Sequence, residues 1–349
     1  MLFFNRIAAT LALLVLVLTA QAQDSKDHDP LFADDGIIEV RLEGPFKMLR
    51  RERPDELEAP GTFSFSTADG ATKSLDVNIR TRGNYRRNQK ICDFPPLRLN
   101  FQKSQTKDTL FDKQDKFKLV THCETLSARY EQTVVSEYLA YRVLNILTDR
   151  SFGVRLLRIT YAFTDSDREI ENYAILIEHK DRLAKRIGGK SIRAERTDIA
   201  DIGPDDLNLA FVFQYFLGNT DFSPVRTAPD EDCCHNQALL VNEDALDYTV
   251  PFDFDLTGFV NAPHAVVNER FKLSSVRTRL YRGRCFNLDQ LPATLDLFRE
   301  KRTEIEALPG SRAELLPPTR RHIERYIAAF YKTIDSPKRV EREMARRCT

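Results

Sequence analysis

Four polar residues in the middle of the chain have the types and order that phosphoryl transfer requires. Asp221 follows Gly218-Asn219-Thr220, Asn236 comes after a gap, and two carboxylates alternate with phenylalanines in Phe252-Asp253-Phe254-Asp255. One carboxylate can orient or deprotonate an acceptor hydroxyl, while an amide and a second carboxylate hold a divalent metal against phosphates. Each piece alone also suits an ordinary turn, because Asp and Asn favour turns for local reasons. Together and in this order they favour a phosphoryl-transfer site.

Two predicted elements position these residues. The apolar run from Leu207 to Leu217 predicts a helix that ends at Gly218, a residue suited to the position after a helix C-terminus. Asp221 then lies in the loop that follows the helix. The apolar stretches 238–241 and 248–252 predict two strands joined by a turn at 244–247. Asn236 therefore precedes a hairpin, and Asp253 follows it.

This order of motifs resembles the atypical kinases of the spore coat protein H family (CotH-like), and more distantly HipA-like and lipid kinases. The resemblance covers residues 36 to 300, and its motifs are concentrated between Gly218 and Gly258. It implies a metal-dependent kinase that uses Mg²⁺ or Mn²⁺ and takes ATP as co-substrate. In that family's terms Asp221 is the catalytic carboxylate and Asn236 helps to hold the metal. Asp253, which directly follows two apolar residues, is the first choice for the metal-binding Asp, and Asp255 is either the second choice or a second ligand. The stretch between Asp221 and Asn236, which contains Pro224 and Pro229, is longer than the corresponding loop of protein kinases.

A basic turn upstream is the first candidate for binding nucleotide phosphates. Arg82, Gly83 and Asn84 come directly after a predicted strand and resemble the R-G-N turn of the same family. Backbone N–H groups and a guanidinium in such a turn can hold phosphate oxygens. A plain hairpin bend would use the same residue types, and the stretch lacks the G-x-G-x-x-G pattern of a kinase glycine loop.

Four further charged residues complete the predicted nucleotide site. A cation on the phosphates needs a helix carboxylate to orient it, and Arg98 and Lys118 are the candidate cations, with Glu137 as their partner. Glu178 ends a predicted strand at the position where the family places a Glu near the nucleotide base. Each of these charges could instead be a solvated surface group, which is the usual fate of Lys, Arg and Glu.

The order of predicted elements indicates an α+β, two-lobed protein-kinase-like fold. A strand-rich N-lobe with one main helix is expected over residues 36–180, and a mainly helical C-lobe with the catalytic loop and the metal-binding hairpin over 181–349. An unspecified α+β domain would satisfy the same elements. Strands are predicted over 36–42, 62–67, 75–82, 95–101, 116–120, 154–163 and 171–178, a loop over 46–60, and helices over 131–147, 207–217, 289–308 and 319–334.

The N-terminus and the cysteines indicate export. Asn5-Arg6, an apolar run from Ile7 to Ala20 and the Ala20-Gln21-Ala22 cleavage signal predict a signal peptide over residues 1–22, followed by a flexible leader over 23–35. The mature chain has no apolar stretch of about 18 residues, so no integral membrane segment is expected. Six cysteines permit up to three disulfides in an oxidising periplasmic or extracellular compartment. We expect the adjacent Cys233 and Cys234 to pair with separate partners.

Composition and spacing argue against several other functions. With 52 basic and 52 acidic residues, global charge argues neither for nor against nucleic acid, and none is expected as a partner. Cys233-Cys234-His235 lacks the second ligand pair of a zinc site. Nothing beyond the paired carboxylates Asp253 and Asp255 suggests a glycosidase, since tryptophan is absent. The expected partners are a nucleotide and a protein acceptor; a catalytically inactive binding or envelope-structural protein and an AMP transferase remain alternatives.

Overall fold

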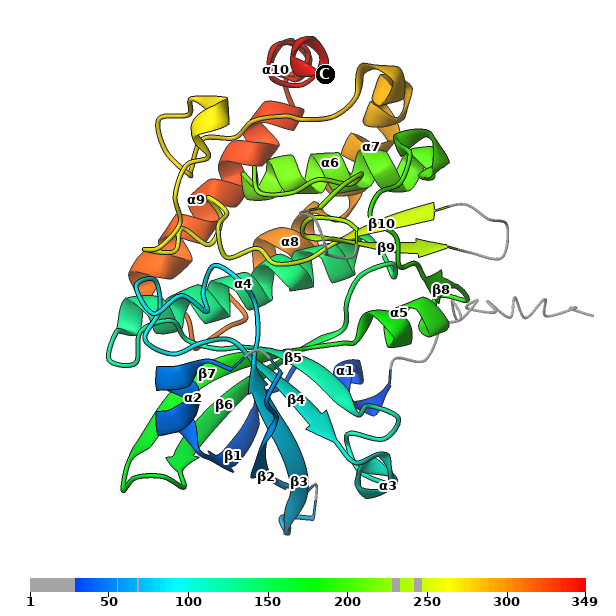
Figure 1. Cartoon of the computed structure of the whole chain (residues 1–349). Coiled ribbons are helices and arrows are strands. Elements are labelled where there is room, and N and C mark those ends of the chain that lie inside the picture. The colour runs from blue at the N-terminus through cyan, green and yellow to red at the C-terminus, as the bar shows by residue number, and fades with distance from the viewer. Residues whose placement is uncertain (1–28, 55, 68, 228–232, 242–246) are drawn as a thin grey trace, which may run out of the picture.

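A closed β-barrel and a set of helices make up the part of the chain that the structure describes. This computed structural model describes residues 29–349 except 55, 68, 228–232 and 242–246 (Figure 1). The predicted signal peptide (1–22), the start of the predicted leader, Pro229 and most of the turn predicted over 244–247 lie outside the described residues.

Seven strands close the barrel in the order β1-β2-β3-β4-β5-β7-β6. All neighbouring pairs are antiparallel except β1 and β6, which run parallel with Ile38 beside Leu157 and Gly44 beside Phe163. Because β1 pairs with β2 on one side and β6 on the other, this sheet has no free edge. The strands are β1 (Ile38–Gly44), β2 (Ala59–Ser66), β3 (Thr72–Thr81), β4 (Leu97–Phe101), β5 (Lys116–Val120), β6 (Val154–Phe163) and β7 (Glu169–Ile177).

The closed mixed barrel overturns the two-lobed kinase fold expected from the sequence. The rest of the chain is also not a mainly helical lobe, since it carries a three-stranded sheet in the order β10-β9-β8 and long irregular segments among its helices. Local alternation predicts where strands lie and which neighbours form hairpins. It carries no signal for the parallel contact between β1 and β6, which are far apart in the sequence and whose pairing closes the sheet.

The barrel interior and its outer face have different chemistry. Aromatic side chains fill the interior, where Phe111 packs edge-on against Phe63 with ring centroids 5.3 Å apart. Outward-facing residues of three neighbouring strands form a basic row, because Arg98 pairs in register with Arg80 on one side and with Lys118 on the other. Alternate residues of a strand point to opposite faces, so Leu97 and Leu99 are buried while this row faces outward.

Two short helices pack on the barrel where no helix was predicted. The segment predicted as a loop over 46–60 begins with α2 (Phe46–Glu52), whose Phe46 and Leu49 are buried. In the predicted leader, α1 (Pro30–Ala33) buries Leu31 and Phe32 in the barrel's hydrophobic cluster. Two other short helices are α3 (Lys103–Thr106), which contacts β3, and α5 (Lys180–Arg186), which lies against the small sheet of β8 and β9.

The long helix α4 (Ala128–Leu147) lies between the barrel and the remaining helices (Figure 1). Beyond it, Phe216 of α6 packs against Phe298 of α7 and Phe330 of α9, with ring centroids 5.7 Å and 5.0 Å apart. The single helix predicted over 289–308 is divided into a 3₁₀ turn at 285–290, α7 and α8. These helices are α6 (Pro204–Leu217), α7 (Leu291–Glu300), α8 (Arg302–Ala307), α9 (Pro317–Ile334) and α10 (Pro337–Glu343), with short 3₁₀ turns at 199–201, 269–271 and 345–347.

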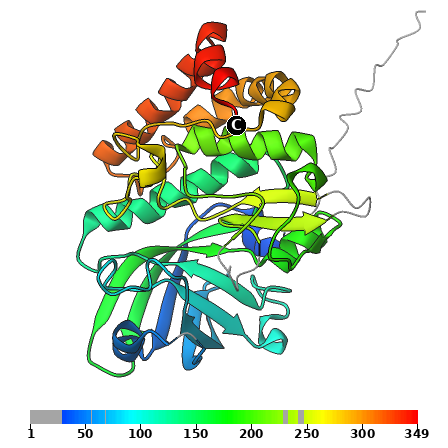
Figure 2. The same ribbon diagram turned by 45° about the horizontal axis from the view of Figure 1, so that its top comes forward.

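A small sheet links the helices to the barrel. Strands β9 (Gln237–Val241) and β10 (Asp247–Pro251) form an antiparallel hairpin, and β8 (Lys190–Ser191) adds to its edge. In both views the hairpin lies between α6 and the barrel (Figures 1 and 2). None of the helices in the described ranges is long and apolar enough to cross a membrane.

All six cysteines form disulfides: Cys92–Cys123, Cys233–Cys234 and Cys285–Cys348. The number agrees with the sequence prediction of up to three. The expectation that Cys233 and Cys234 pair with separate partners is wrong, because the two neighbours are bonded to each other.

Candidate functional site

The loop after α6 holds Asp221 in place through a series of hydrogen bonds. Gly218 ends the helix in the left-handed conformation (φ 65°), and its N–H donates to the carbonyls of Gln214 and Tyr215. The Asp221 N–H then donates to Asn219 Oδ1 over 2.8 Å. The Asp221 carboxylate keeps 35% of its side-chain surface exposed, so it remains accessible to a substrate.

Two neighbours orient the Asp221 carboxylate. His235 Nε2 lies 2.8 Å from Asp221 Oδ1, and because a carboxylate only accepts hydrogen bonds, this nitrogen carries the proton. Asn236 Nδ2 donates to Asp221 Oδ2 over 3.1 Å and to the Asp221 carbonyl over 2.7 Å. Asn236 itself has φ 54°, a conformation that Asn tolerates better than most residues. The loop Asp and the following Asn therefore form one hydrogen-bonded unit.

The hairpin brings Asp253 to the same place. Gln237 of β9 pairs with Pro251 of β10, and the Phe252 N–H donates to the Asn236 carbonyl over 3.1 Å. Asp253 follows with φ 63°, and its N–H donates to Tyr141 Oη of α4 over 2.9 Å. Burial raises the pKa of Asp253, and the nearby Asp255 raises it further. A cation beside these two carboxylates would relieve that repulsion.

Asp255 is buried and held by two basic side chains. Arg86 Nη1 lies 3.3 Å and His264 Nε2 3.1 Å from Asp255 Oδ2. Burial opposes ionisation of Asp255, but His264 and Arg86 outweigh that effect and lower its pKa. Arg86 Nη2 also donates to the Thr121 carbonyl over 2.7 Å, which ties this side chain to the end of β5.

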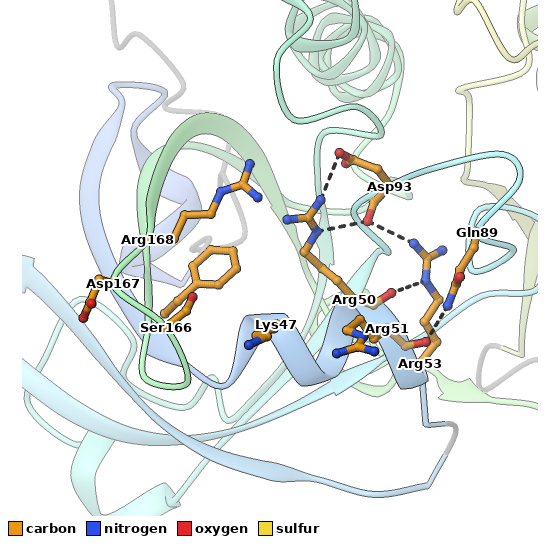
Figure 3. Close-up of a pocket in the computed structure, with 10 residues that line it drawn as sticks. Lys47, Arg50, Arg51, Arg53, Gln89, Asp93, Ser166, Asp167 and Arg168 are labelled. Atoms are coloured by element: carbon orange, nitrogen blue, oxygen red, sulfur yellow. Dashed lines mark hydrogen bonds and ion pairs between the residues drawn. The ribbon is translucent and has the colours of Figure 1, made fainter.

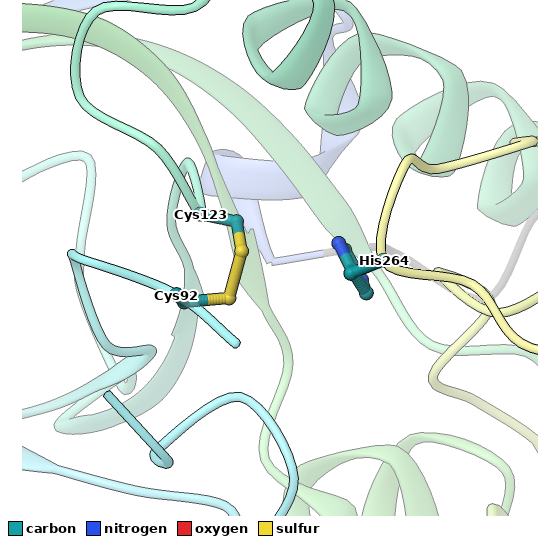
Figure 4. Close-up of side chains that lie close together, drawn as sticks. All are labelled: Cys92, Cys123 and His264. Carbon is teal, nitrogen blue, oxygen red and sulfur yellow. A yellow bond between two sulfur atoms is a disulfide. The ribbon is translucent and has the colours of Figure 1, made fainter. Parts of the chain in front are cut away.

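His264 belongs to the one group of three described His, Cys, Asp or Glu side chains whose ligand atoms lie within 4.8 Å of one another. The others are Cys92 and Cys123, whose disulfide faces the histidine ring (Figure 4). The bonded sulfurs offer no thiolate, and His264 Nε2 is already used by Asp255. In the oxidised protein His264 therefore supports Asp255, and the two bonded cysteines offer no thiolate ligand.

Glu137 lies behind the site with a different partner from the one predicted. Its ion pair is with Arg86, at 3.8 Å between Oε2 and Nη1, whereas the sequence predicted Arg98 or Lys118. Burial, with Asp255 and Asp253 nearby, raises the pKa of Glu137 to about 8. Arg86 is closer to Asp255 than to Glu137, so it neutralises mainly the former.

Seven of the predicted site residues line one cavity of about 280 Å³, here called the phosphate cavity. They come from three separate parts of the chain: the end of β3, the loop after α6, and the residues flanking the β9–β10 hairpin. Arg86 and His235, which the sequence prediction did not include, line it as well. The seven are Arg82, Gly83, Asn84, Asp221, Asn236, Asp253 and Asp255.

Three more predicted residues, Arg98, Lys118 and Glu178, line a neighbouring cavity of about 390 Å³. Phe252 and Cys234 line both cavities, so the two adjoin. Burial and the nearby Arg82 lower the pKa of Lys118 to about 7, and its Nζ lies 4.1 Å from the Phe252 ring centroid.

The Glu178 side chain is already used within the fold. Its carboxylate lies 2.9 Å from Arg186 Nη2 and accepts a hydrogen bond from the Gly153 N–H over 2.9 Å. Glu178 is only 2% exposed, so its carboxylate serves the fold while the residue forms part of the cavity wall.

Another cavity, of about 640 Å³, lies against α2 and is lined by none of the predicted site residues (Figure 3). Its basic side chains include Arg50 and Arg53. Arg53 donates to the carbonyls of Arg50, Arg87, Cys92 and Asp93, and Arg50 pairs with the Asp93 carboxylate over 3.0 Å. These bonds clamp α2 to the segment that precedes β4.

The donor set at the phosphate cavity fits Mg²⁺ or Mn²⁺. Asn236, Asp253 and Asp255 offer amide and carboxylate oxygens, which are the ligands that these hard cations take. Mg²⁺ is usually bound by one or two carboxylates together with substrate phosphates and waters. The partners of Asp255 occupy only its Oδ2, so a metal would bind Asp255 through the other oxygen.

The residues that sequence reasoning missed act through the predicted ones. Arg86 lies in the basic turn after Gly83-Asn84, so its charge was visible, but nothing local pairs it with Asp255. His235 directly precedes Asn236, and that adjacency was a usable signal for its contact with Asp221. His264 and Tyr141 lie in separate segments and had no sequence signal.

Compared with known proteins, the chain matches no protein-family model, no curated protein and no solved structure.

Proposed function

We propose that this protein is an exported, metal-dependent phosphotransferase that moves a phosphoryl group from ATP to a hydroxyl of a protein acceptor. The observation that carries the proposal is that Asp221, Asn236, Asp253 and Asp255 line one cavity, which Arg82 and Gly83 also line. If these residues served only to form separate turns, their side chains would not be expected to line the same cavity. The order of the motifs, which resembles that of the CotH-like kinases, supports the same activity.

Asp221 is the group that handles the acceptor. Its carboxylate accepts the proton of the attacking hydroxyl, and His235 and Asn236 hold it in position. The acceptor oxygen forms a bond to the γ-phosphorus while the bridging bond between that phosphorus and the β-phosphate oxygen breaks, and the electron pair leaves with ADP. Catalysis is then mostly positioning and charge neutralisation.

The nucleotide occupies the two adjoining cavities in this proposal. Asn236, Asp253 and Asp255 would hold Mg²⁺ or Mn²⁺, which neutralises phosphate charge when bound. Arg82 and the Gly83-Asn84 backbone face the phosphates, and Arg98 and Lys118 line the neighbouring cavity. Phosphate oxygens beside Lys118 would favour its charged form over the neutral form that burial favours.

Two features support export. The N-terminal sequence has the pattern of a signal peptide, and the disulfides are of the kind that form in oxidising compartments. The protein would therefore act in the periplasm or outside the cell.

The test is thermal unfolding of the oxidised mature protein with Mg²⁺ or Mn²⁺, with and without ATP. A ligand at about 100 times its Kd adds about 2.7 kcal/mol to the free energy of unfolding, a shift of a few degrees. We expect that shift in the wild type only when metal and ATP are both present. Asp253→Asn should abolish it, while Asp296→Asn, a control at an exposed carboxylate of α7, should leave it intact.

Asp221→Asn separates binding from chemistry. This variant should keep the shift with metal and ATP, because Asp221 is not among the proposed metal ligands, but lose turnover of ATP. Absence of any shift in the wild type would refute the proposal. A shift that Asp253→Asn leaves unchanged would place the nucleotide elsewhere.

A further inference from the structure

A second and larger cavity adjoins the phosphate cavity at Asp221. Its volume is about 650 Å³, and we call it the arginine groove. Asp221, Thr227 and His235 line both this groove and the phosphate cavity. A group lying in the groove can therefore reach the same carboxylate that the phosphate cavity exposes.

The groove is strongly basic. Five arginines line it, and none of them forms an ion pair with a carboxylate in the part of the chain that the structure describes. The one carboxylate side chain among its described lining residues is that of Asp221. The five are Arg226, Arg270, Arg282, Arg284 and Arg347.

The arginines have two distinct roles. Arg282 is structural: its Nη1 donates to the carbonyls of Thr220 and Phe222 on either side of Asp221, over 3.0 Å and 2.9 Å. Burial and the nearby Arg270 and Arg284 lower the pKa of Arg282 to about 10, so it stays charged at neutral pH. Arg270 is exposed and forms no ion pair with a described carboxylate.

Two further arginines of the groove, Arg284 and Arg347, lie next to a disulfide. Arg284 and Arg347 directly precede Cys285 and Cys348, whose Cα atoms are 4.9 Å apart in the disulfide. Arg284 Nη1 donates to Thr349 Oγ1 over 3.1 Å, and its buried Nε has no hydrogen-bond partner. Both arginines line the groove, and neither forms an ion pair with a described carboxylate side chain, so an anionic ligand could supply the missing charge.

The groove also has an apolar wall, which a free small anion would not use. Phe222, Pro224, Val225, Phe271 and Leu280 line it beside the arginines. The cavity is within the size range of ligand pockets, which is enough for a few residues of an extended chain. Mixed basic and apolar walls suit a peptide that carries both carboxylates and an apolar side chain.

We propose that the arginine groove binds an acidic segment of the protein acceptor and presents a Ser or Thr hydroxyl of that segment to Asp221. The inference rests on the proposed function, because it assigns the acceptor class of the same site. Carboxylates of the segment pair with Arg270, Arg284 and Arg347, and an apolar side chain packs against Phe222 and Phe271.

Binding of labelled peptides to the full oxidised chain, measured by fluorescence anisotropy without nucleotide, tests the groove. The probe is a peptide of Glu and Asp with one Phe beside a central Ser, compared with the same peptide in which Gln replaces every acidic residue. We expect the acidic peptide to bind at least tenfold more tightly. Arg347→Ala should weaken it by about tenfold, which corresponds to about 1.4 kcal/mol.

The matched control is Arg346→Ala, one position earlier in the chain. Arg346 is largely exposed, pairs with Glu341 over 2.9 Å and does not line the groove. Its removal should leave peptide binding unchanged. With ATP and Mg²⁺ present, Arg347→Ala should raise the KM for the acidic peptide while kcat changes little, because Arg347 does not touch the reacting atoms.

Further outcomes separate this inference from the proposed function. If ATP and metal shift the unfolding temperature but the acidic and Gln peptides bind alike, the groove inference is overturned and the phosphotransferase stands. If the acidic peptide binds in the groove but no ATP shift occurs, the groove is not an acceptor site. Tighter binding of a sulfated oligosaccharide than of the acidic peptide, abolished by Arg347→Ala, would also overturn the assignment to a peptide.

Discussion

At the scale of single residues, the site depends on one buried arginine. Arg86 is 9% exposed and contacts Asp255, Glu137 and the Thr121 carbonyl, so it joins a proposed metal ligand, α4 and the end of β5. Removing one partner of a buried charge pair leaves the other uncompensated. The two carboxylates near Arg86 depend on it to different extents, because Asp255 stays ionised while Glu137 is driven towards its protonated form.

That difference gives a prediction for the metal-free protein at pH 7. Arg86→Met should lower the free energy of unfolding by about 3–5 kcal/mol, because it leaves Asp255 charged and buried. Glu137→Gln should not lower it. The raised pKa of Glu137 means that this group ionises more readily in the unfolded chain than in the folded one, which at pH 7 favours the unfolded state. Glutamine does not ionise, so it removes this stabilisation of the unfolded state. Urea unfolding of both variants checks the prediction, which is wrong if Glu137→Gln costs as much as Arg86→Met.

A buried histidine that lines none of the described cavities gives a pH dependence. His122 is fully buried between Phe94 and Tyr161, with ring centroids 4.5 Å and 5.5 Å away, and neither ring nitrogen has a hydrogen-bond partner. Burial lowers the pKa of His122 to about 3. The folded state therefore keeps a neutral ring while the unfolded chain takes up a proton below pH 6.5. This contribution to stability is complete above pH 6.5 and is lost as the pH falls towards 3.

His122→Phe should remove that dependence. Between pH 6.5 and pH 5 the wild type should lose about 2 kcal/mol through this group, at about 1.4 kcal/mol for each pH unit. The variant should show a shallower decline over the same range, whatever its absolute stability. Unfolding free energies measured in urea at several pH values decide this, and identical slopes for the two proteins would contradict it.

At the scale of elements, sequence predicted what local patterns encode. The helix ending at Gly218, the hairpin before Asp253 and the long central helix are present, because each is specified by residues close in sequence. The pairing of β1 with β6 and the contact of Arg86 with Asp255 join segments that are distant in the sequence, and no residue spacing predicts either of them. The disulfide between Cys233 and Cys234 was not predicted, because two adjacent cysteines were expected to pair with separate partners.

The end of α6 positions Asp221, and Gly218 is the residue on which it depends. Its φ of 65° favours glycine, and an added Cβ would overlap the hydroxyl of Tyr326 in α9. Gly188, just after α5, has φ 76° but open space around an added Cβ, so it is the matched control. Gly188→Ala should cost about 1–2 kcal/mol, the penalty for an L-residue in this conformation.

Gly218→Ala should cost about 1–3 kcal/mol more than Gly188→Ala, because the overlap adds to the same backbone penalty. It should also reduce the turnover of ATP by displacing the Asp221 loop. Thermal unfolding and ATP turnover of the two variants test both statements. Equal stability losses in the two variants would show that Tyr326 moves away from the added Cβ without a cost in stability and does not fix the loop.

At the scale of the whole molecule, two hydrophobic clusters meet across the site. One fills the barrel, and the other joins α4, α6 and α9 to the outer side of β6 and β7. The proposed nucleotide cavities lie between residues of the barrel strands and residues of the hairpin, so relative movement of the two clusters would change their width. Covalent links that restrain either cluster therefore bear on both stability and binding.

The three disulfides should differ in what they contribute. Cys285–Cys348 has a sequence separation of 63 and Cys233–Cys234 a separation of 1. In the chain-entropy account, closing the long loop stabilises the protein by about 4 kcal/mol, whereas bonded neighbours close no comparable loop. Replacing Cys285 and Cys348 by Ala should therefore lower the urea midpoint much more than replacing Cys233 and Cys234.

Loss of the Cys285–Cys348 disulfide should also weaken peptide binding in the arginine groove. Without it, Arg284 and Arg347 are no longer held together, so the acidic peptide should bind more weakly even at temperatures where the variant is fully folded. The ATP shift should remain, because neither arginine lines the nucleotide cavities. Replacing Cys233 and Cys234 should have the opposite pattern, since both line the cavity that holds Arg98 and Lys118. If both replacements affect the same ligand, the two sites are not separate in the way the structure indicates.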